Sequence, residues 1–415
     1  MSSSAVPPRT GRLVVGLVID DNLDRPDGVQ QYVLTLGAEL ARRGHDVHYI
    51  ASTTQRTDLP NLHVIGRNVG VTFNGNRLAT PLPASRTQVR ELLARVPFDV
   101  LHVQMPYSPV LAGRIVSAAS PRTAVVGTFH IYPHSWWVSA GTRVLGLLER
   151  RRLRRFRTVF ATSEAAAAFA NRTFRVPTTV LGNPVDLARF RPAQAPADPD
   201  RPVRVVFLGR LVPRKGPREL VAAALEVTRR GTARPWTLTL AGRGPLHDEL
   251  VATLAKAGMT NVELPGFVDE QDKPALLADA DVIALPSTGG ESFGISVVEA
   301  LASARGVVLA GDNPGYRTTM HGLERQLLDP KDTATFALAL GRWIDDAEAR
   351  DRIAERQREA AARFDTPRIA DEVERVYRSA VAGRPAVTAV AAVTPVTAGS
   401  ADVPPRPARR RSPAR

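Results

Sequence analysis

Two glutamates, Glu291 and Glu299, stand with seven residues between them where a predicted strand gives way to a predicted helix. The apolar run 282–285 predicts a buried strand, a turn of Pro, Ser, Thr and Gly follows it, and apolar residues recur with helical spacing from Ile295 onward. A helix that begins there presents unpaired N–H groups and a partial positive charge, which suit phosphate and sugar oxygens. Glu291 at the mouth could reach a sugar, and Glu299, two turns inside, a ribose. The same spacing also occurs in surface loops ahead of ordinary amphipathic helices.

A second buried-type strand, 203–208, ends in a basic turn that contains Arg210 and Lys215 between glycines. Arg can give a phosphate paired hydrogen bonds and Lys a point charge, so the turn is a suitable clamp for a diphosphate. With these cations and a helix terminus, the diphosphate charge can be neutralised without a metal. Asp279 and Asp281 spell D-x-D, a pattern that can hold a metal, but they lie where a helix end enters a strand. We interpret them as structural and predict no metal site.

A histidine follows a third strand, 124–129, at His130. Ligands of open parallel sheets bind beyond the carboxyl ends of the strands, so His130 is well placed for a site, although a single histidine at a strand end is more often structural. The loop beyond it carries His134 and Trp136, which could pack or could contact an acceptor.

Several motifs in the same order resemble the family-4 retaining glycosyltransferases of the GT-B fold, and within them the phosphatidylinositol mannosyltransferases. The resemblance spans about residues 12 to 380 and implies an α/β protein, GT-B, with two Rossmann-like doubly wound parallel-sheet domains facing a central cleft. The motifs are Gly28-Val29-Gln30, Phe98 to His102, Thr128-Phe129-His130, Gly209-Arg210 with Lys215-Gly216, Gly266 to Glu270 with Lys273, and Gly290 to Gly294 with Glu299.

The resemblance also implies roles for these residues. Arg210 and Lys215 would stabilise the departing diphosphate, Glu291 would orient the sugar hydroxyls, and His130 would close the sugar site from the other domain; these four are the predicted catalytic set. No protein base is assigned, because the leaving phosphate takes the acceptor proton. The predicted donor-binding residues are Gly28, Val268, Glu270, Phe293, Gly294, Ile295 and Glu299, and the predicted acceptor residues are Asn74, His134 and Trp136.

Smaller features of the sequence bear on the identity of the base and of the acceptor. Glu270 could accept from guanine N1–H and N2–H₂, a donor pair that uracil lacks, so a GDP-sugar is favoured over a UDP-sugar as donor; no cofactor is expected. Asp27 stands where the family usually has the first of two glycines, and a Lys expected shortly after Thr-Phe-His is missing.

The composition fits a globular protein in a reducing compartment. The 415 residues contain no Cys, which excludes disulfides and thiolate zinc sites. No run approaches the ~18 apolar residues of a membrane span, and residues 1–11 lack the apolar core of a signal peptide. We therefore expect a cytoplasmic protein that can lie peripherally on the inner face of a membrane.

Positive charge is concentrated in the first half and the tail. Residues 1–185 hold 22 Arg against 11 acids (+11), residues 186–383 hold 27 basic against 29 acidic residues (−2), and the remainder carries +5, which together give +14. Such a half could meet an anionic membrane surface or nucleic acid, or it could be merely solvated. The basic stretch 142–157 is either a membrane-surface helix or an ordinary domain helix. Only Trp136 and Trp137 could stack on bases, so we expect no nucleic acid.

The chain divides into a short N-terminal segment, two domains, a linker, a crossing helix and a tail. We predict disorder for 1–11, an acceptor domain at 12–190, a Pro- and Asp-rich linker at 191–202, a donor domain at 203–366, a helix at 367–383 that crosses back to the first domain, and a disordered basic tail at 384–415. No feature specifies an oligomeric state.

The predicted function is transfer of a hexose, mannose from GDP-mannose, to a lipid-linked or polyol acceptor such as phosphatidylinositol. The alternatives are a glucosyltransferase that uses a UDP-sugar with diacylglycerol or a small acceptor, and, more remotely, a basic nucleic-acid-binding protein. A sugar-nucleotide epimerase of the same fold would need an acid/base pair near the sugar, and only His130 is a candidate.

Overall fold

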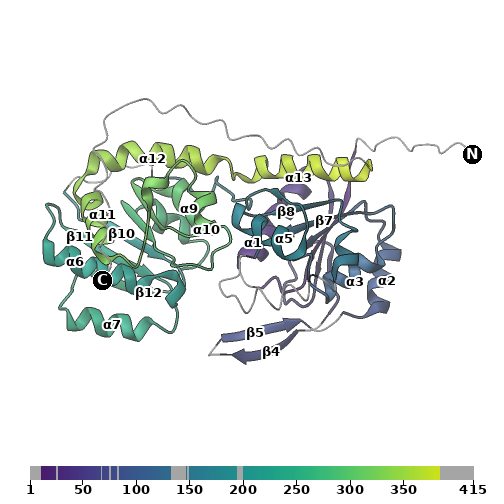
Figure 1. Cartoon of the computed structure of the whole chain (residues 1–415), viewed down its shortest axis with the longest axis horizontal. Coiled ribbons are helices and arrows are strands. Elements are labelled where there is room, and N and C mark those ends of the chain that lie inside the picture. Colours follow the sequence, from purple (N-terminus) through teal and green to yellow (C-terminus); the bar gives the residue numbers. More distant parts are fainter. Residues whose placement is uncertain are drawn as a thin grey trace, which may run out of the picture.

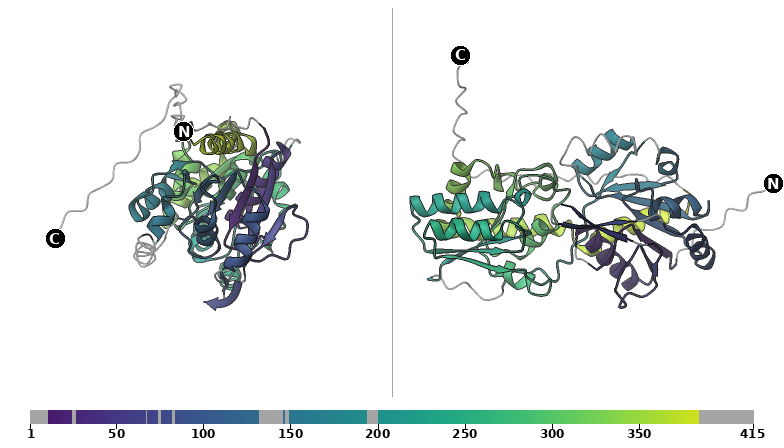
Figure 2. Two further views of the ribbon diagram at one scale, coloured as in Figure 1. Left: turned by 90° about the vertical axis from the view of Figure 1, so that its right-hand side faces the viewer. Right: turned by 90° about the horizontal axis from the view of Figure 1, so that it is seen from below.

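The chain folds into two α/β units, each built on a parallel sheet with apolar clusters on both of its faces (Figure 1). The computed structural model describes residues 11–24, 27–66, 68–73, 76–81, 84–131, 146, 149–193 and 200–383, with the backbone alone for 68–73 and 76–81. Figure 2 shows the two units side by side along the long axis. The predicted fold class, two doubly wound parallel sheets, is confirmed.

The first sheet has seven parallel strands in the order β3-β2-β1-β6-β7-β8-β9. Its inner strands are short and almost wholly buried, as expected for strands covered on both faces. The strand order reverses between β1 and β6, which is where ligands of such sheets usually bind. The strands are β1 (Val14–Ile19), β2 (Asp46–Ala51), β3 (Leu62–Val64), β6 (Val100–Gln104), β7 (Ala124–Phe129), β8 (Thr158–Ala161) and β9 (Thr179–Val180).

Helices α1 (Gly28–Arg42), α2 (Arg86–Arg95), α3 (Leu111–Ala118) and α5 (Glu164–Phe174) belong to this unit, together with the antiparallel hairpin β4 (Asn68–Phe73) and β5 (Asn76–Pro81). The hairpin, α3 and α5 were not predicted from the sequence. Helix α5 is a run of alanines with a weak apolar period, and its start is fixed by Ser163, whose side chain accepts a hydrogen bond from the N–H of Ala166.

The second sheet has six parallel strands in the order β12-β11-β10-β13-β14-β15. The strands are β10 (Val203–Leu208), β11 (Trp236–Ala241), β12 (Val262–Gly266), β13 (Val282–Leu285), β14 (Val307–Gly311) and β15 (Leu327–Leu328). Its helical elements are η1 (Pro213–Lys215), α6 (Pro217–Arg230), α7 (His247–Lys256), α8 (Lys273–Ala278), α9 (Ile295–Ser303), α10 (Pro314–Thr319), η2 (Glu324–Gln326), α11 (Thr333–Asp345) and α12 (Ala347–Ala362).

Helix α13 (Thr366–Val381) leaves the second unit and packs on the first (Figure 1). Its apolar face, which includes Ile369, Val373 and Tyr377, joins the core formed by β1 and α1. The chain crosses between the units at Val185, whose N–H donates to the Phe364 carbonyl at 2.9 Å and whose carbonyl accepts from the Thr366 N–H at 3.1 Å.

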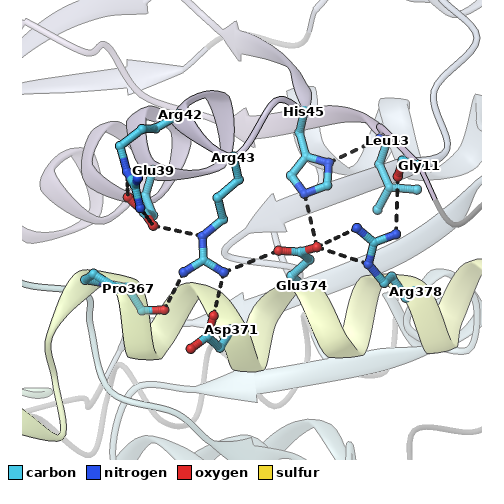
Figure 3. A network of polar contacts seen from close by, with 10 residues as sticks. All are labelled: Gly11, Leu13, Glu39, Arg42, Arg43, His45, Pro367, Asp371, Glu374 and Arg378. Carbon is cyan, nitrogen blue, oxygen red and sulfur yellow. Dashed lines mark hydrogen bonds and ion pairs between the residues drawn. The ribbon is translucent and has the colours of Figure 1, made fainter.

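A network of ion pairs fixes α13 to the end of α1 (Figure 3). Arg43, whose side chain is 18% exposed, lies 2.6 Å from Asp371 and 3.3 Å from Glu374. Glu374 also pairs with Arg378, and its Oε1 lies 3.5 Å from His45 Nε2. Arg43, Glu374 and His45 are at most 19% exposed, so the contacts among these three hold α13 more firmly than exposed surface pairs would.

Candidate active site

The basic turn after β10 converges on Glu291. Lys215 Nζ lies 2.9 Å from Glu291 Oε1, Arg214 Nη1 donates to the same oxygen at 2.6 Å, and Ser287 Oγ donates to it at 3.0 Å. Gly216 makes this turn feasible: its φ is +76°, and a Cβ there would meet the Pro286 carbonyl oxygen at 2.0 Å.

The Glu291 carboxylate stays charged although it is buried. Burial alone would raise its pKa, but Lys215 and Arg214 outweigh burial and hold the pKa below its usual value. All three donors that contact this carboxylate within the described residues bind Oε1, so Oε2 remains to accept from a ligand hydroxyl.

Helix α9 begins directly beside this cluster. Gly294 precedes its first residue with φ +91°, and a Cβ there would lie 2.5 Å from the Tyr316 ring. Phe293 is 2% exposed, and its ring packs edge-on against Phe364 at a centroid distance of 5.0 Å. The Phe293 side chain therefore supports the turn, and a contact from the Phe293 and Gly294 amides to a sugar remains a prediction.

Glu299 and Glu270 share one lysine. Lys273 Nζ donates to both oxygens of Glu299, at 2.9 and 3.1 Å, and lies 3.0 Å from Glu270 Oε2. Burial raises the pKa of Glu299 despite the attraction of Lys273. The Glu270 carbonyl accepts from Arg189 at 2.8 Å, and partly buried Val268 lies in the same turn. The predicted base and ribose residues are thus joined by Lys273.

On the first sheet, His130 continues β7 at its carboxyl end. Its Nε2 lies 2.7 Å from Oε1 of Gln104, the last residue of the adjacent strand β6. The Tyr32 ring packs edge-on against the imidazole at a centroid distance of 5.0 Å. Burial lowers the pKa of His130 to about 3, so the ring is neutral at physiological pH.

Helix α1 connects this histidine to the second unit. Tyr32 lies one turn after Gly28, and a Cβ at Gly28 would stand 3.6 Å from the Ile295 side chain at the start of α9. The Thr162 and Ser292 hydroxyls meet at 3.1 Å, and the Glu164 N–H donates to Thr318 at 3.2 Å. The glycine turn of one unit therefore faces the helix tip of the other.

Arg210 stands apart from these clusters. Its side chain is exposed and makes no hydrogen bond or ion pair with any residue that the structure describes. The predicted acceptor residues Asn74, His134 and Trp136 lie outside the described residues.

The D-x-D pair has structural partners. Both oxygens of Asp281 accept from Arg201, at 2.7 and 2.9 Å, and Asp279 pairs with Arg204. These contacts lie at the amino end of β13, whereas Glu291 follows its carboxyl end, in agreement with the structural interpretation.

The basic surfaces are of two kinds. Arg86, Arg90 and Arg95 of α2 are exposed. In the stretch 142–157, of which 146 and 149–157 are described, Arg155 donates to the carbonyls of Ser117 and Ala119. Part of this cationic stretch is therefore structural. None of the helices in the described ranges combines the length and apolar content needed to cross a membrane.

Three contributors were missed from the sequence. Arg214 lies in the basic turn, but only its neighbour Lys215 was assigned a role from the sequence. Gln104 and Tyr32 were not singled out; the signal for Gln104 was a polar residue at the end of a buried strand.

Two doubly wound sheets, with a cationic turn and helix tip on one and a neutral imidazole on the other, define a glycosyltransferase of the GT-B class. The solved structure of HepE from Anabaena, in complex with UDP and glucose, has this fold; it superimposes with a TM-score of 0.68 at 19% identity and covers 89% of this chain and 100% of that chain. Residues 26–189 match the family described as Glycosyltransferase Family 4, and residues 191–360 match Glycosyl transferases group 1. The chain belongs to glycosyltransferase family 4.

Its relatives include proteins named phosphatidyl-myo-inositol mannosyltransferase. That of Mycobacterium tuberculosis is 31% identical over 387 residues, which cover 91% of this chain and 99% of that protein. That of Propionibacterium freudenreichii is 31% identical over 379 residues, which cover 88% of this chain and 94% of that protein. A protein from Salinispora arenicola named D-inositol 3-phosphate glycosyltransferase is 34% identical over 220 residues, 48% of each chain.

Proposed function

We propose that this glycosyltransferase moves a mannosyl group from GDP-mannose to phosphatidylinositol, with retention at the anomeric carbon and without a metal. The observation that carries the proposal is the convergence of Lys215 and Arg214 on Glu291 beside the start of α9, opposite Gly28. The names of the mycobacterial and propionibacterial relatives support the sugar and the acceptor.

The cations act on the leaving group. As the bond between the anomeric carbon and the diphosphate oxygen breaks, negative charge grows on that oxygen. Lys215 and the exposed Arg210 stabilise it, and the N–H groups at the start of α9 add partial positive charge. Because these groups supply the positive charge, we expect a chelator to leave the rate unchanged.

Glu291 binds the sugar through its unpaired oxygen. Its Oε2 accepts from hydroxyls of the transferred sugar, while Lys215 and Arg214 keep the carboxylate ionised. The acceptor oxygen bonds to the anomeric carbon on the face that the diphosphate leaves, and the departing phosphate oxygen takes the acceptor proton. No protein base is needed for this balance.

The base is read in the turn that contains Val268 and Glu270. Lys273 occupies Oε2 of Glu270, so Oε1 is left to accept from guanine N1–H and N2–H₂. The buried Glu299 carboxylate, fixed by Lys273, accepts from the ribose.

The acceptor is presented at a membrane surface. Exposed Arg86, Arg90 and Arg95 on α2 give the first unit a cationic face that an anionic lipid surface attracts, by roughly 1 kcal/mol for each residue near the surface. Raising the salt concentration should then release the protein from anionic vesicles.

The test combines binding and turnover. Thermal shifts are measured with GDP, UDP and ADP, and the sugar nucleotide that matches the best ligand is then offered with phosphatidylinositol, diacylglycerol and soluble inositol 3-phosphate. Stabilisation by GDP and turnover with phosphatidylinositol are expected. Stabilisation by UDP with turnover on diacylglycerol would replace the proposal with a glucosyltransferase. Turnover with inositol 3-phosphate alone would instead assign to this chain the acceptor that the name of the Salinispora relative gives.

A further inference from the structure

Gln104 is a fully buried polar side chain where apolar residues would be expected. It ends β6 opposite Thr128 of β7 and is 0% exposed. Its Oε1 lies 2.7 Å from His130 Nε2, while its own Nε2 has no hydrogen-bond partner among the residues that the structure describes. Leaving a buried donor unpaired costs about 1–3 kcal/mol, so the side chain is not placed there for stability.

The backbone beside Gln104 is also unusual. Met105, the next residue, has φ +55°, in the left-handed region that residues other than Gly seldom adopt. Such conformations gather at functional sites, because stabilising contacts elsewhere must hold them in place. This turn lies at the carboxyl end of β6, next to the carboxyl end of β7, after which His130 follows.

The contact fixes the tautomer of the imidazole. An amide oxygen only accepts, so His130 Nε2 must carry the ring proton and Nδ1 must carry the lone pair. The opposite tautomer would set two acceptors against each other at 2.7 Å. Tyr32, packed edge-on, fixes the ring plane.

We propose that Gln104 is a positioning residue that holds His130 in the Nε2-protonated tautomer, so that Nδ1 accepts a hydrogen bond from a hydroxyl of the transferred sugar. The identity of that hydroxyl rests on the proposed function, whereas the tautomer does not. In the part of the chain that the structure describes, the titratable side chains that face the ring are Tyr32 of α1 and His102 of β6.

Nitrogen NMR of histidine-labelled protein tests the tautomer without any substrate. The His130 resonances are assigned from their loss in His130→Gln. A protonated, pyrrole-type Nε2 and an unprotonated, pyridine-type Nδ1 are expected at pH 7. A proton on Nδ1 would mean that the Gln104 amide is turned round and donates to the ring, which overturns the proposal.

Two variants test the effect on catalysis. Gln104→Glu keeps an acceptor but places a carboxylate against the ring, which should raise the pKa of His130 and protonate Nδ1 as the pH falls. Its kcat should be near that of the wild type at high pH and fall about tenfold towards low pH, an inflection absent from the wild type. Gln104→Met, which removes the acceptor, should lower kcat about tenfold at every pH, the loss of one hydrogen bond.

The matched control is Gln55→Glu, which adds the same charge at an exposed side chain. It should leave the pH profile unchanged. Thermal unfolding of each variant confirms that it is folded at the assay temperature. A folded Gln104→Glu whose pH profile matches that of the wild type would overturn the proposal. If the protein has no glycosyltransferase activity with any sugar nucleotide, the NMR result still decides the tautomer.

Discussion

The two sides of the site differ in kind. On the second sheet the site residues are ions that neutralise one another: Lys215 and Arg214 with Glu291, and Lys273 with Glu299. On the first sheet they are uncharged: His130 and His102 are both held neutral by burial, with pKa values lowered to about 3. In the proposed function this difference is a division of labour, in which the second unit manages the charge of a diphosphate and the first unit orients neutral hydroxyls.

If the charged side is held together by its pairs, breaking the most buried pair should have the largest effect. In Lys273→Met, Glu299 would be left as an uncompensated charge, since the two side chains are only 10% and 5% exposed. The free energy of unfolding, measured by urea denaturation, should fall by about 3–5 kcal/mol. Lys256→Met on exposed α7 is the control. Adding Glu299→Gln to the first variant should restore part of the loss, and a lack of any recovery would speak against this explanation.

Removing one cation from the leaving-group side should slow the reaction without unfolding the protein. We expect Lys215→Ala to lower kcat by ~10²-fold or more, because the transition-state charge loses its point-charge partner. Arg214 still pairs with Glu291 in this variant, so its thermal midpoint should change little. An unchanged kcat in steady-state assays would remove Lys215 from the mechanism.

The neutral state of buried His102 should be visible in the pH dependence of the free energy of unfolding. His102 is 0% exposed, donates to or accepts from Thr128 at 2.7 Å and Tyr377 at 2.6 Å, and has its pKa lowered to about 3 by burial. In the unfolded chain it takes up a proton below about pH 6.5, which the folded chain resists. The contribution of His102 to the free energy of unfolding should therefore be fully present above pH 6.5. It should fall by about 1.4 kcal/mol per pH unit as the pH drops towards 3.

The variant His102→Gln isolates this dependence. It keeps hydrogen-bonding groups in the core but does not titrate in this range, so its stability should fall less steeply between pH 6 and 4. Parallel curves for the two proteins in thermal unfolding would show that the histidine is not held neutral.

The smallest effect is expected where the two sides touch. The Thr162 and Ser292 hydroxyls, 3.1 Å apart, form a direct side-chain hydrogen bond between the units. A double-mutant cycle of Thr162→Val and Ser292→Ala should give a coupling energy of about 0.5–1.5 kcal/mol in nucleotide binding. Strict additivity would show that this bond is absent when the ligand is bound.

The charged side could be predicted from the sequence, and much of the neutral side could not. Lys215, Glu291 and Glu299 stand in short motifs at strand ends, where glycines and local spacing mark them. Gln104 and His102 look like interruptions of an apolar strand, and their partners are remote: His102 and Tyr377 are 275 residues apart. The local pattern shows these polar residues, but only the fold brings each of them together with its partner.

The same limit explains why the pairing of Glu291 with the two cations was not predicted. Local spacing placed the carboxylate at a helix start and the cations at a strand end, but not the fact that both cations bind one oxygen of that carboxylate. The parallel alignment of β10 with β13 supplies that fact, because it sets the two turns side by side.

The position of α13 has a consequence for synthesis on the ribosome. The core of the first unit includes Ile369, Val373 and Tyr377, and the ion pairs of Arg43 close it from outside (Figure 3). During translation the first sheet emerges from the ribosome before the second unit has been made. Helix α13, which completes the core of the first unit, leaves the exit tunnel only after the second unit, on the order of 10 s or more later. Until then the apolar core residues that α13 covers are exposed to solvent and to chaperones, and the first unit becomes fully native only as α13 docks.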